Sequence, residues 1–205
     1  HLQLPLTQVT YKGKPVIVEG GAIDSNGKGT LLTSEECLMH PSIQVRNPSF
    51  TKEDYEAVFK EYLGITNVIW LGDGIEGNDT HGHIDDLCRF VNEDTIITIV
   101  ESDPKDSNYK PLQDNLKRLQ NAKLENDKSP KIVELPMPKR IDFDGLRLPA
   151  SYANFLILNN CVLVPTFNDA NDRIALNTIA ECFPNREIVG INAIDLIWGF
   201  GTLHC

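Results

Sequence analysis

The chain has 205 residues, of which 41% are hydrophobic, and its formal net charge is −10. This is the composition of a globular protein in water, and it argues against a nucleic-acid partner because no stripe of Lys and Arg is present to neutralise phosphates. No apolar run approaches the ~20 residues of a membrane span and no signal peptide is visible, so no membrane partner is expected either.

The first third of the chain predicts three strands and one amphipathic helix. The strands are expected at 15–23, 30–33 and 67–71, and the helix at 52–63. Apolar residues of the helix recur at i, i+3, i+4, i+7 and i+8, while Thr51 can cap its start and Gly64 can end it. The first strand carries Glu19 inside an apolar run and is interrupted by two glycines.

The same order of elements then recurs twice. Further strands are expected at 87–90, 95–100, 131–135, 155–158, 162–164 and 186–191, with helices that open at Pro111 and Asp172. The three helices begin at 52, 111 and 172, so successive starts lie 59 and 61 residues apart. This period predicts an α/β repeat architecture of β-β-α-β units. An open array, a closed ring and an ordinary α/β sandwich all remain compatible with it.

The cysteines number five and are scattered, with no C-x-x-C pair. This favours a reducing compartment, the cytoplasm, over a disulfide framework, and it excludes a standard zinc ribbon. The chain begins at His1 rather than Met and ends at Cys205, so a piece of a longer protein is expected. The sequence leaves a homo-oligomer open.

Cys205 ends a run, 197–205, in which two glycines precede the dipeptide His-Cys. Glycines let a chain turn sharply and present a side chain without crowding, so the thiol is a candidate nucleophile. A buried free cysteine is the alternative.

His83 and Asp85 lie two residues apart in a segment expected to be extended, where both side chains point to the same face. One can therefore bind a cation while the other moves protons. Two alternatives stay open: a plain surface loop, or a metal site in which His81, His83 and nearby acids are ligands. Glu19 can equally be an exposed strand residue.

Taken together, these motifs resemble the agmatine deiminase branch of the guanidino-group-modifying superfamily, the penteins. The resemblance rests on stretches in family order at 19–21 (EGG), 30–38, 79–85 (DTHGHID), 148–155, 162–167 and 198–205. It implies a five-fold pseudo-symmetric α/β propeller with the active site on its axis. About three units are expected here, at 15–72, 83–138 and 151–193, with the next beginning at 197–205.

Two departures from the family pattern matter. Phe200 interrupts the glycines that usually precede the nucleophile, which puts the conformation of that loop in doubt. The family also has another substrate-binding aspartate and an aromatic-glycine stretch upstream of the EGG motif, and neither is present in these residues.

By position, the resemblance implies that Cys205 is the nucleophile and His83 the general acid/base. Asp85 and Glu19 match the carboxylates that bind the guanidinium, and no metal or other cofactor is implied. Glu19 is expected either to complete the carboxylate clamp or to keep His83 protonated, because a carboxylate raises the pKa of a neighbouring imidazole.

The implied partner is a small cationic guanidino substrate: agmatine, hydrolysed to N-carbamoylputrescine and ammonia through a covalent thiouronium on Cys205. A peptidyl- or free-arginine deiminase is the close alternative, and a site for free arginine needs an Arg to pair with the substrate carboxylate. The arginines nearest the motifs are Arg89, Arg140 and Arg147. The sequence also leaves open a non-catalytic binding module of this fold and a metal-dependent hydrolase.

Three further residues lie near the motifs. Trp198 and Tyr152 are expected either to line the aliphatic part of the substrate or to pack in the core. His204 is disfavoured as the catalytic base, because adjacent residues of a strand face opposite sides.

Overall fold

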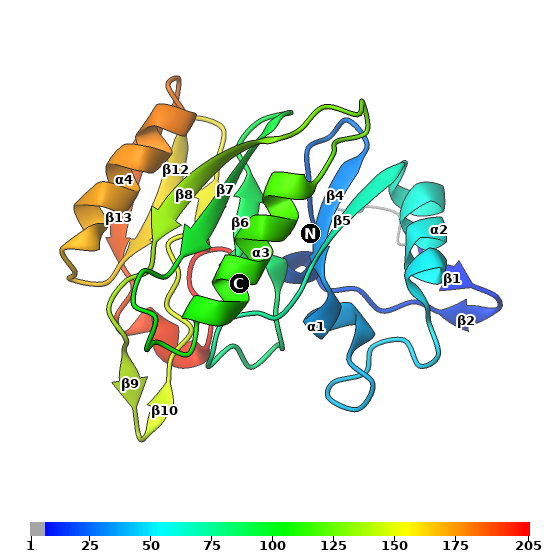
Figure 1. Ribbon diagram of the computed structural model, residues 1–205, viewed down its shortest axis with the longest axis horizontal. Coiled ribbons are helices and arrows are strands. Elements are labelled where there is room, and N and C mark those ends of the chain that lie inside the picture. The colour runs from blue at the N-terminus through cyan, green and yellow to red at the C-terminus, as the bar shows by residue number, and fades with distance from the viewer. Residues whose placement is uncertain (1–6) are drawn as a thin grey trace.

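The computed structural model describes residues 7–205, and its main feature is a row of three small sheets side by side (Figure 1). Their strands are β3 (Asp24–Ser25), β4 (Thr30–Ser34) and β5 (Asn67–Leu71); β6 (Cys88–Phe90), β7 (Thr95–Val100) and β8 (Lys131–Pro136); β11 (Leu156–Ile157), β12 (Cys161–Thr166) and β13 (Glu187–Asn192). In each sheet the first pair is antiparallel and the second parallel. The same β-β-α-β order therefore occurs three times.

A helix links the two parallel strands of each sheet, because such strands need a long crossover connection. These helices are α2 (Lys52–Leu63), α3 (Tyr109–Asn121) and α4 (Asn171–Cys182). Thr51 and Asp54 form a capping box at the start of α2, and Gly64 ends it with φ +70°. The predicted cap and stop of this helix are thus confirmed, whereas α3 begins two residues before the predicted Pro111.

Short elements fill the connections. They are the hairpin strands β1 (Thr10–Tyr11), β2 (Lys14–Pro15), β9 (Asp142–Phe143) and β10 (Leu146–Arg147), helix α1 (Glu35–Met39), and the 3-10 turns η1 (Gly20–Ala22), η2 (Ile84–Asp86) and η3 (Leu196–Gly199). The turns η1 and η2 contact each other. This contact brings the predicted polar stretches of the first and second units together.

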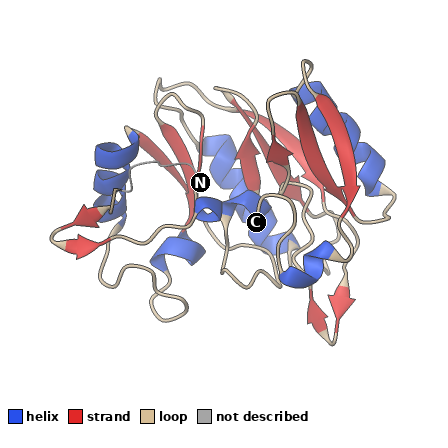
Figure 2. Ribbon diagram, turned by 180° about the vertical axis from the view of Figure 1, so that it is seen from behind, coloured by secondary structure: helices blue, strands red, loops and turns tan. Residues whose placement is uncertain are grey.

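Two apolar clusters hold the described residues together. One extends across the second and third sheets and reaches the first through Leu32, Ile69 and Leu71. The other lies between the first sheet and α2 and includes the fully buried Tyr55. Helix α3 contacts both β5 and β7, so it joins the first two sheets. The chain finally returns to the middle of the molecule, where its C-terminus lies (Figures 1 and 2).

One predicted strand, 15–23, is wrong, and so is the extended backbone expected around His83 and around His204. The segment 15–23 pairs only at Lys14–Pro15 and then turns into η1, because its two glycines close a 3-10 turn. The segment around His83 and Asp85 is the start of η2, not a strand. The residues after Phe200 form a loop. In all three places the polar side chains converge because the backbone turns, not because strand residues alternate.

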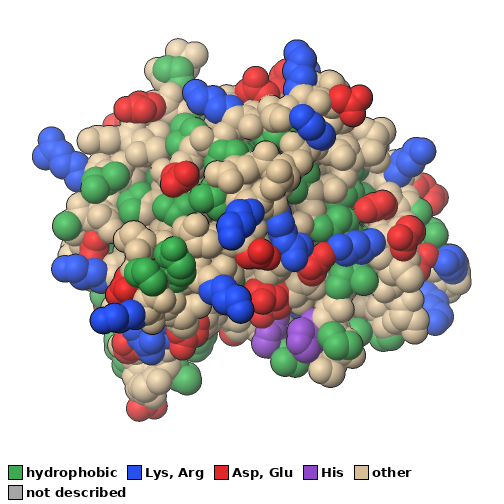
Figure 3. Space-filling model, in the orientation of Figure 1, with side chains coloured by type: hydrophobic (Ala, Val, Ile, Leu, Met, Phe, Trp, Pro, Cys, Tyr) green, Lys and Arg blue, Asp and Glu red, His purple; other side chains and the backbone are tan. Residues whose placement is uncertain are grey.

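The surface agrees with the charge analysis. On the face shown in Figure 3, Lys and Arg side chains are interspersed with Asp and Glu and form no stripe of one sign. None of the helices in the described part of the chain has the length and apolar character that crossing a bilayer requires.

Candidate active site

Asp85 is the centre of the candidate site. Its side chain is fully buried in η2, and its Oδ2 accepts a hydrogen bond from the Cys205 thiol at 2.7 Å. His204 Nδ1 lies 2.7 Å from the same oxygen, and Cys205 Sγ lies 3.8 Å from His83 Nδ1. Residues 120 positions apart in the sequence therefore meet at one carboxylate. His204 belongs to this group, contrary to the prediction, because its segment is a loop.

Glu19 approaches His83 from η1, at whose N-terminal cap it lies. Arg46 fixes it: Arg46 Nε donates to Glu19 Oε1 at 2.9 Å, and the other guanidinium nitrogens of Arg46 donate to backbone carbonyls, including that of Cys37. Arg46 stands in none of the predicted motifs. Only the folded structure shows that it orients the carboxylate.

Three polar atoms of this group are buried and lack a hydrogen-bond partner among the described residues: Glu19 Oε2, His83 Nε2 and Asp85 Oδ1. Leaving such a group unpaired costs on the order of 1–3 kcal/mol. Two carboxylate oxygens and one imidazole nitrogen are thus positioned to bind something beyond the chain's own residues.

The close approach of η1 and η2 requires a glycine. A Cβ on Gly21 would lie 2.5 Å from His83 Nδ1 and 3.0 Å from Asp85 Oδ2, whereas a Cβ on Gly20 would meet nothing within 4 Å. Of the two glycines in the EGG motif, Gly21 is therefore the one that makes room for the site.

Asn154 holds the loop that carries Cys205. Its buried Oδ1 accepts hydrogen bonds from the backbone N–H of Thr202, His204 and Cys205, at 3.3, 3.1 and 3.2 Å, and from the Thr202 hydroxyl at 2.8 Å. Phe200, which occupies a usual glycine position, has φ +61° and so adopts the left-handed conformation that glycine favours. Asn154 lies in the motif 148–155, but its type and position alone do not reveal this role.

Burial is the largest influence on the pKa values of Cys205 and His83. Burial, followed by the charges of Asp85 and Asp86, raises the pKa of the Cys205 thiol. Burial also lowers the pKa of His83, and it outweighs the opposing effect of Asp85 and Glu19. Glu19 does favour the imidazolium, as expected, but the net shift is towards the neutral ring. The protein groups by themselves thus favour a neutral thiol beside a neutral imidazole.

Other predicted residues lie elsewhere. Trp198 is 52% exposed and stacks on Phe143 at 4.0 Å between ring centroids, so the core interpretation is wrong for it and its contact with a substrate stays a prediction. Tyr152 is fully buried and donates to Asp172, as the core alternative predicts. His81 lies 3.7 Å from Glu36 and belongs to neither group of clustered donors around His83.

The three candidate arginines are each paired with acids. Arg89 lies 3.5 Å from Asp24. Arg140 donates to the exposed Asp142, while the buried Arg147 donates to Asp106. Among the described residues, none of these three is left without an acidic partner for a substrate carboxylate.

Comparison with known proteins identifies the family of this chain. Residues 3–205 match the model of the Porphyromonas-type peptidyl-arginine deiminase family. A curated relative from Lactococcus lactis subsp. lactis, named "Putative agmatine deiminase", is 38% identical over 96% of this chain and 57% of its own length. The chain therefore spans little more than half of that relative.

Solved structures of agmatine deiminases are also similar to this chain. A substrate-bound agmatine deiminase of C. jejuni superposes with a TM-score of 0.84 and 37% identity over 92% of this chain and 54% of that one. The agmatine deiminase of Enterococcus faecalis gives a TM-score of 0.86 and 35% identity over 92% and 56%. An amidinotransferase from Microseira wollei, 15% identical with a TM-score of 0.50, covers 90% and 45% and shares the mixed α/β fold alone. The chain belongs to the Porphyromonas-type peptidyl-arginine deiminase family.

Proposed function

We propose that this protein is an agmatine deiminase, which hydrolyses the guanidinium of agmatine to N-carbamoylputrescine and ammonia. The observation that carries the proposal is that Cys205 and Asp85 cluster with His83 on one side and Glu19 clusters with it on the other, with three of these residues' polar atoms buried and unpartnered among the described residues. Membership of a deiminase family and likeness to solved agmatine deiminases support it.

The unpartnered carboxylate oxygens suit a guanidinium. This group is planar, stays protonated near pH 7 and presents a fork of N–H donors that carboxylates accept. Asp85 Oδ1 takes one edge of the fork and Glu19 Oε2 faces another. The clamp localises the positive charge and holds the central carbon beside Cys205.

Binding of this cation activates the thiol. The charges of Asp85 and Asp86 help to keep the pKa of Cys205 raised, and a guanidinium bound between the carboxylates offsets them. The thiol proton then passes to His83, which lies within 3.8 Å of the sulfur. The reactive pair becomes thiolate and imidazolium only when the substrate cation is in place.

The reaction then needs no further proton source. The Cys205 thiolate attacks the guanidino carbon, and the tetrahedral adduct expels ammonia as His83 returns the proton to the leaving nitrogen. A covalent thiouronium remains. The neutral His83 takes a proton from water as its oxygen attacks the same carbon, and collapse of this second adduct releases the ureido product and the thiolate.

Agmatine is favoured over free arginine. Among the described residues, Arg89, Arg140 and Arg147 each already have an acidic partner, and Arg46 is engaged by Glu19 and backbone carbonyls, which favours a substrate without an α-carboxylate. Agmatine lacks that carboxylate.

We also propose that the complete protein is a five-unit α/β propeller. The three β-β-α-β sheets correspond to three of five units, and the matched structures are nearly twice as long as this chain. We expect the complete ring to contribute the additional aspartate of the clamp.

The test is an assay of the full-length protein for ureido product from agmatine, arginine and a peptidyl-arginine. We expect turnover of agmatine, and loss by roughly 10⁴-fold or more in Cys205→Ser with agmatine binding retained. Cys161→Ser is the control, because Cys161 lies on β12 and belongs to neither group of clustered donors around His83. Undiminished turnover by Cys205→Ser would remove the covalent mechanism, and preference for an arginine substrate would select the alternative.

A further inference from the structure

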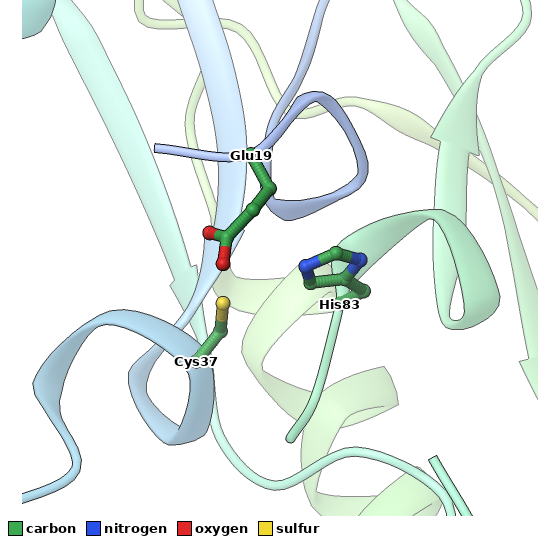
Figure 4. A group of neighbouring side chains, drawn as sticks. All are labelled: Glu19, Cys37 and His83. Carbon is green, nitrogen blue, oxygen red and sulfur yellow. The ribbon is translucent and has the colours of Figure 1, made fainter. Parts of the chain in front are cut away.

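A second cysteine, Cys37, lies beside the candidate site and has no part in the proposed reaction. It belongs to α1 and is 2% exposed. Its sulfur, a carboxylate oxygen of Glu19 and a nitrogen of His83 all lie within 4.8 Å of one another. Figure 4 shows the three side chains pointing towards a common position, each from a different segment of the chain.

Two donor atoms of this group are available to bind a ligand. Glu19 Oε2 and His83 Nε2 are buried without a hydrogen-bond partner among the described residues, and His83 itself is 5% exposed. Arg46 binds the other oxygen of Glu19, which fixes the direction in which Oε2 points. A partner behind a ligand that orients it in this way is typical of metal sites.

The kind of ligand follows from the donor set. One thiol, one imidazole and one carboxylate match the preferences of Zn²⁺ and similar borderline-soft divalent cations, whereas Mg²⁺ and Ca²⁺ prefer oxygen ligands alone. A guanidinium could use Glu19, but it gains nothing from a sulfur donor. Because of Cys37, this group of donors suits a metal ion better than it suits the guanidinium of the substrate.

We propose that Glu19, Cys37 and His83 bind a Zn²⁺-like cation, and that this ion inhibits the enzyme reversibly. Binding replaces the proton of the Cys37 thiol, which passes to solvent as the S–metal bond forms, with no change of oxidation state. The ion also occupies one ring nitrogen of His83 and the free oxygen of Glu19. The inhibition rests on the proposed function; the binding does not.

A neighbouring triad, His83, Asp85 and Cys205, also has clustered donor atoms and shares His83 with the first. The experiment must therefore tell the two apart. Co²⁺ is a suitable probe, because a thiolate bound to it gives a charge-transfer absorption that reports sulfur ligation directly. Zn²⁺ is then added to displace it.

Purified wild-type protein and Cys205→Ser are both expected to bind one Co²⁺ with the thiolate absorption, and Zn²⁺ to abolish it. Cys37→Ser is expected to lose the absorption, and Glu19→Gln to weaken Co²⁺ binding on the order of tenfold or more. His81→Ala is the control, because His81 lies outside both triads. Circular dichroism checks that each variant is folded.

The opposite pattern would overturn the proposal: absorption that persists in Cys37→Ser and vanishes in Cys205→Ser, or no absorption in the wild-type protein. Glu19→Gln supplies a second readout in a protein that keeps both thiols. In the activity assay, Zn²⁺ is expected to inhibit the wild-type enzyme until a chelator is added. Cys37→Ser is expected to keep its metal-free turnover and to lose sensitivity to Zn²⁺. The Co²⁺ spectra test metal binding by Cys37 whether or not agmatine is the substrate.

Discussion

At the scale of single residues, burial opposes the ionisation of Cys205 and His83 that the proposed mechanism requires. The raised pKa of Cys205 and the lowered pKa of His83 keep both groups neutral, although they lie 3.8 Å apart. Such a thiol is protected from casual oxidation and alkylation, since the thiolate is the reactive form. In the proposed mechanism, a cation bound by the carboxylates of Asp85 and Glu19 triggers the ionisation of Cys205.

Asn154 is the residue whose loss should separate catalysis from binding. Asn154→Ala leaves four donors of the Cys205 loop without their acceptor, so we expect stability to fall by on the order of 1–3 kcal/mol. With the sulfur misplaced, kcat should fall by about 10²-fold while the affinity for agmatine changes little, because the carboxylates remain. Thermal melting, steady-state kinetics and agmatine titration measure the three effects.

Asn159→Ala, at an exposed neighbouring turn, is the matched control and should behave as wild type. A parallel loss of agmatine affinity in Asn154→Ala would mean that the residue supports the whole pocket and not the nucleophile loop.

At the scale of elements, the turns η1 and η2 pack so closely that one added methyl group on Gly21 should displace them. Gly21→Ala places a Cβ 2.5 Å from His83 Nδ1, so either η1 or the imidazole must move. We expect kcat to fall by about 10²-fold, as a displacement near 1 Å can cause. Gly20→Ala should leave kcat near the wild-type value, because its Cβ meets nothing within 4 Å. Equal losses in the two variants would contradict this packing argument.

At the scale of the whole molecule, Arg147 ties together segments that are distant in sequence. From β10 it donates to Asp106 at 2.7 Å and to Ser107 at 3.0 Å, and it lies 3.4 Å from Glu76. Burial acts to raise the pKa of Asp106, but the hydrogen bonds from Arg147 and from the backbone of Asn108, with the Arg147 charge, lower it overall. This ion pair therefore links the β10 hairpin strand, which precedes the third unit, to the loop between β7 and α3 of the second unit.

Arg147→Met should destabilise the protein at pH 7 by on the order of 1–3 kcal/mol, because the partly buried Asp106 carboxylate loses its charge-assisted hydrogen bond from the buried Arg147. A carboxyl with a lowered folded pKa contributes stability above its unfolded pKa and loses it as pH falls through the folded value. The difference in the free energy of unfolding between Arg147→Met and the wild type should thus shrink as pH falls below about 3.9. Urea unfolding at several pH values measures it.

Arg140→Met provides the comparison, since its pair with Asp142 is exposed and screened by solvent and should contribute little to stability. Equal destabilisation by the two substitutions, or a difference for Arg147 that persists at low pH, would contradict the pH argument.

The regular elements were predictable because hydrophobic periodicity is local. The three β-β-α-β patterns, the cap at Thr51 and the stop at Gly64 all follow from neighbouring residues, and the motifs indicated the deiminase family. The predicted strand at 15–23 and the extended backbone predicted around His83 failed because alternation cannot be told from a turn when tertiary contacts decide the backbone. Trp198 failed as a core residue because apolar character does not fix burial.

The sequence by itself therefore determined which chemical groups are present and in which repeating scaffold they are carried. Only the tertiary structure decided that His204 reaches Asp85, that Arg46 orients Glu19, that Asn154 holds the loop of Cys205 and that Cys37 faces His83. Each of these contacts joins segments that no local pattern relates. Their geometry is fixed by the packing of one unit on the next. That packing depends on contacts between distant residues, which local sequence patterns do not reveal.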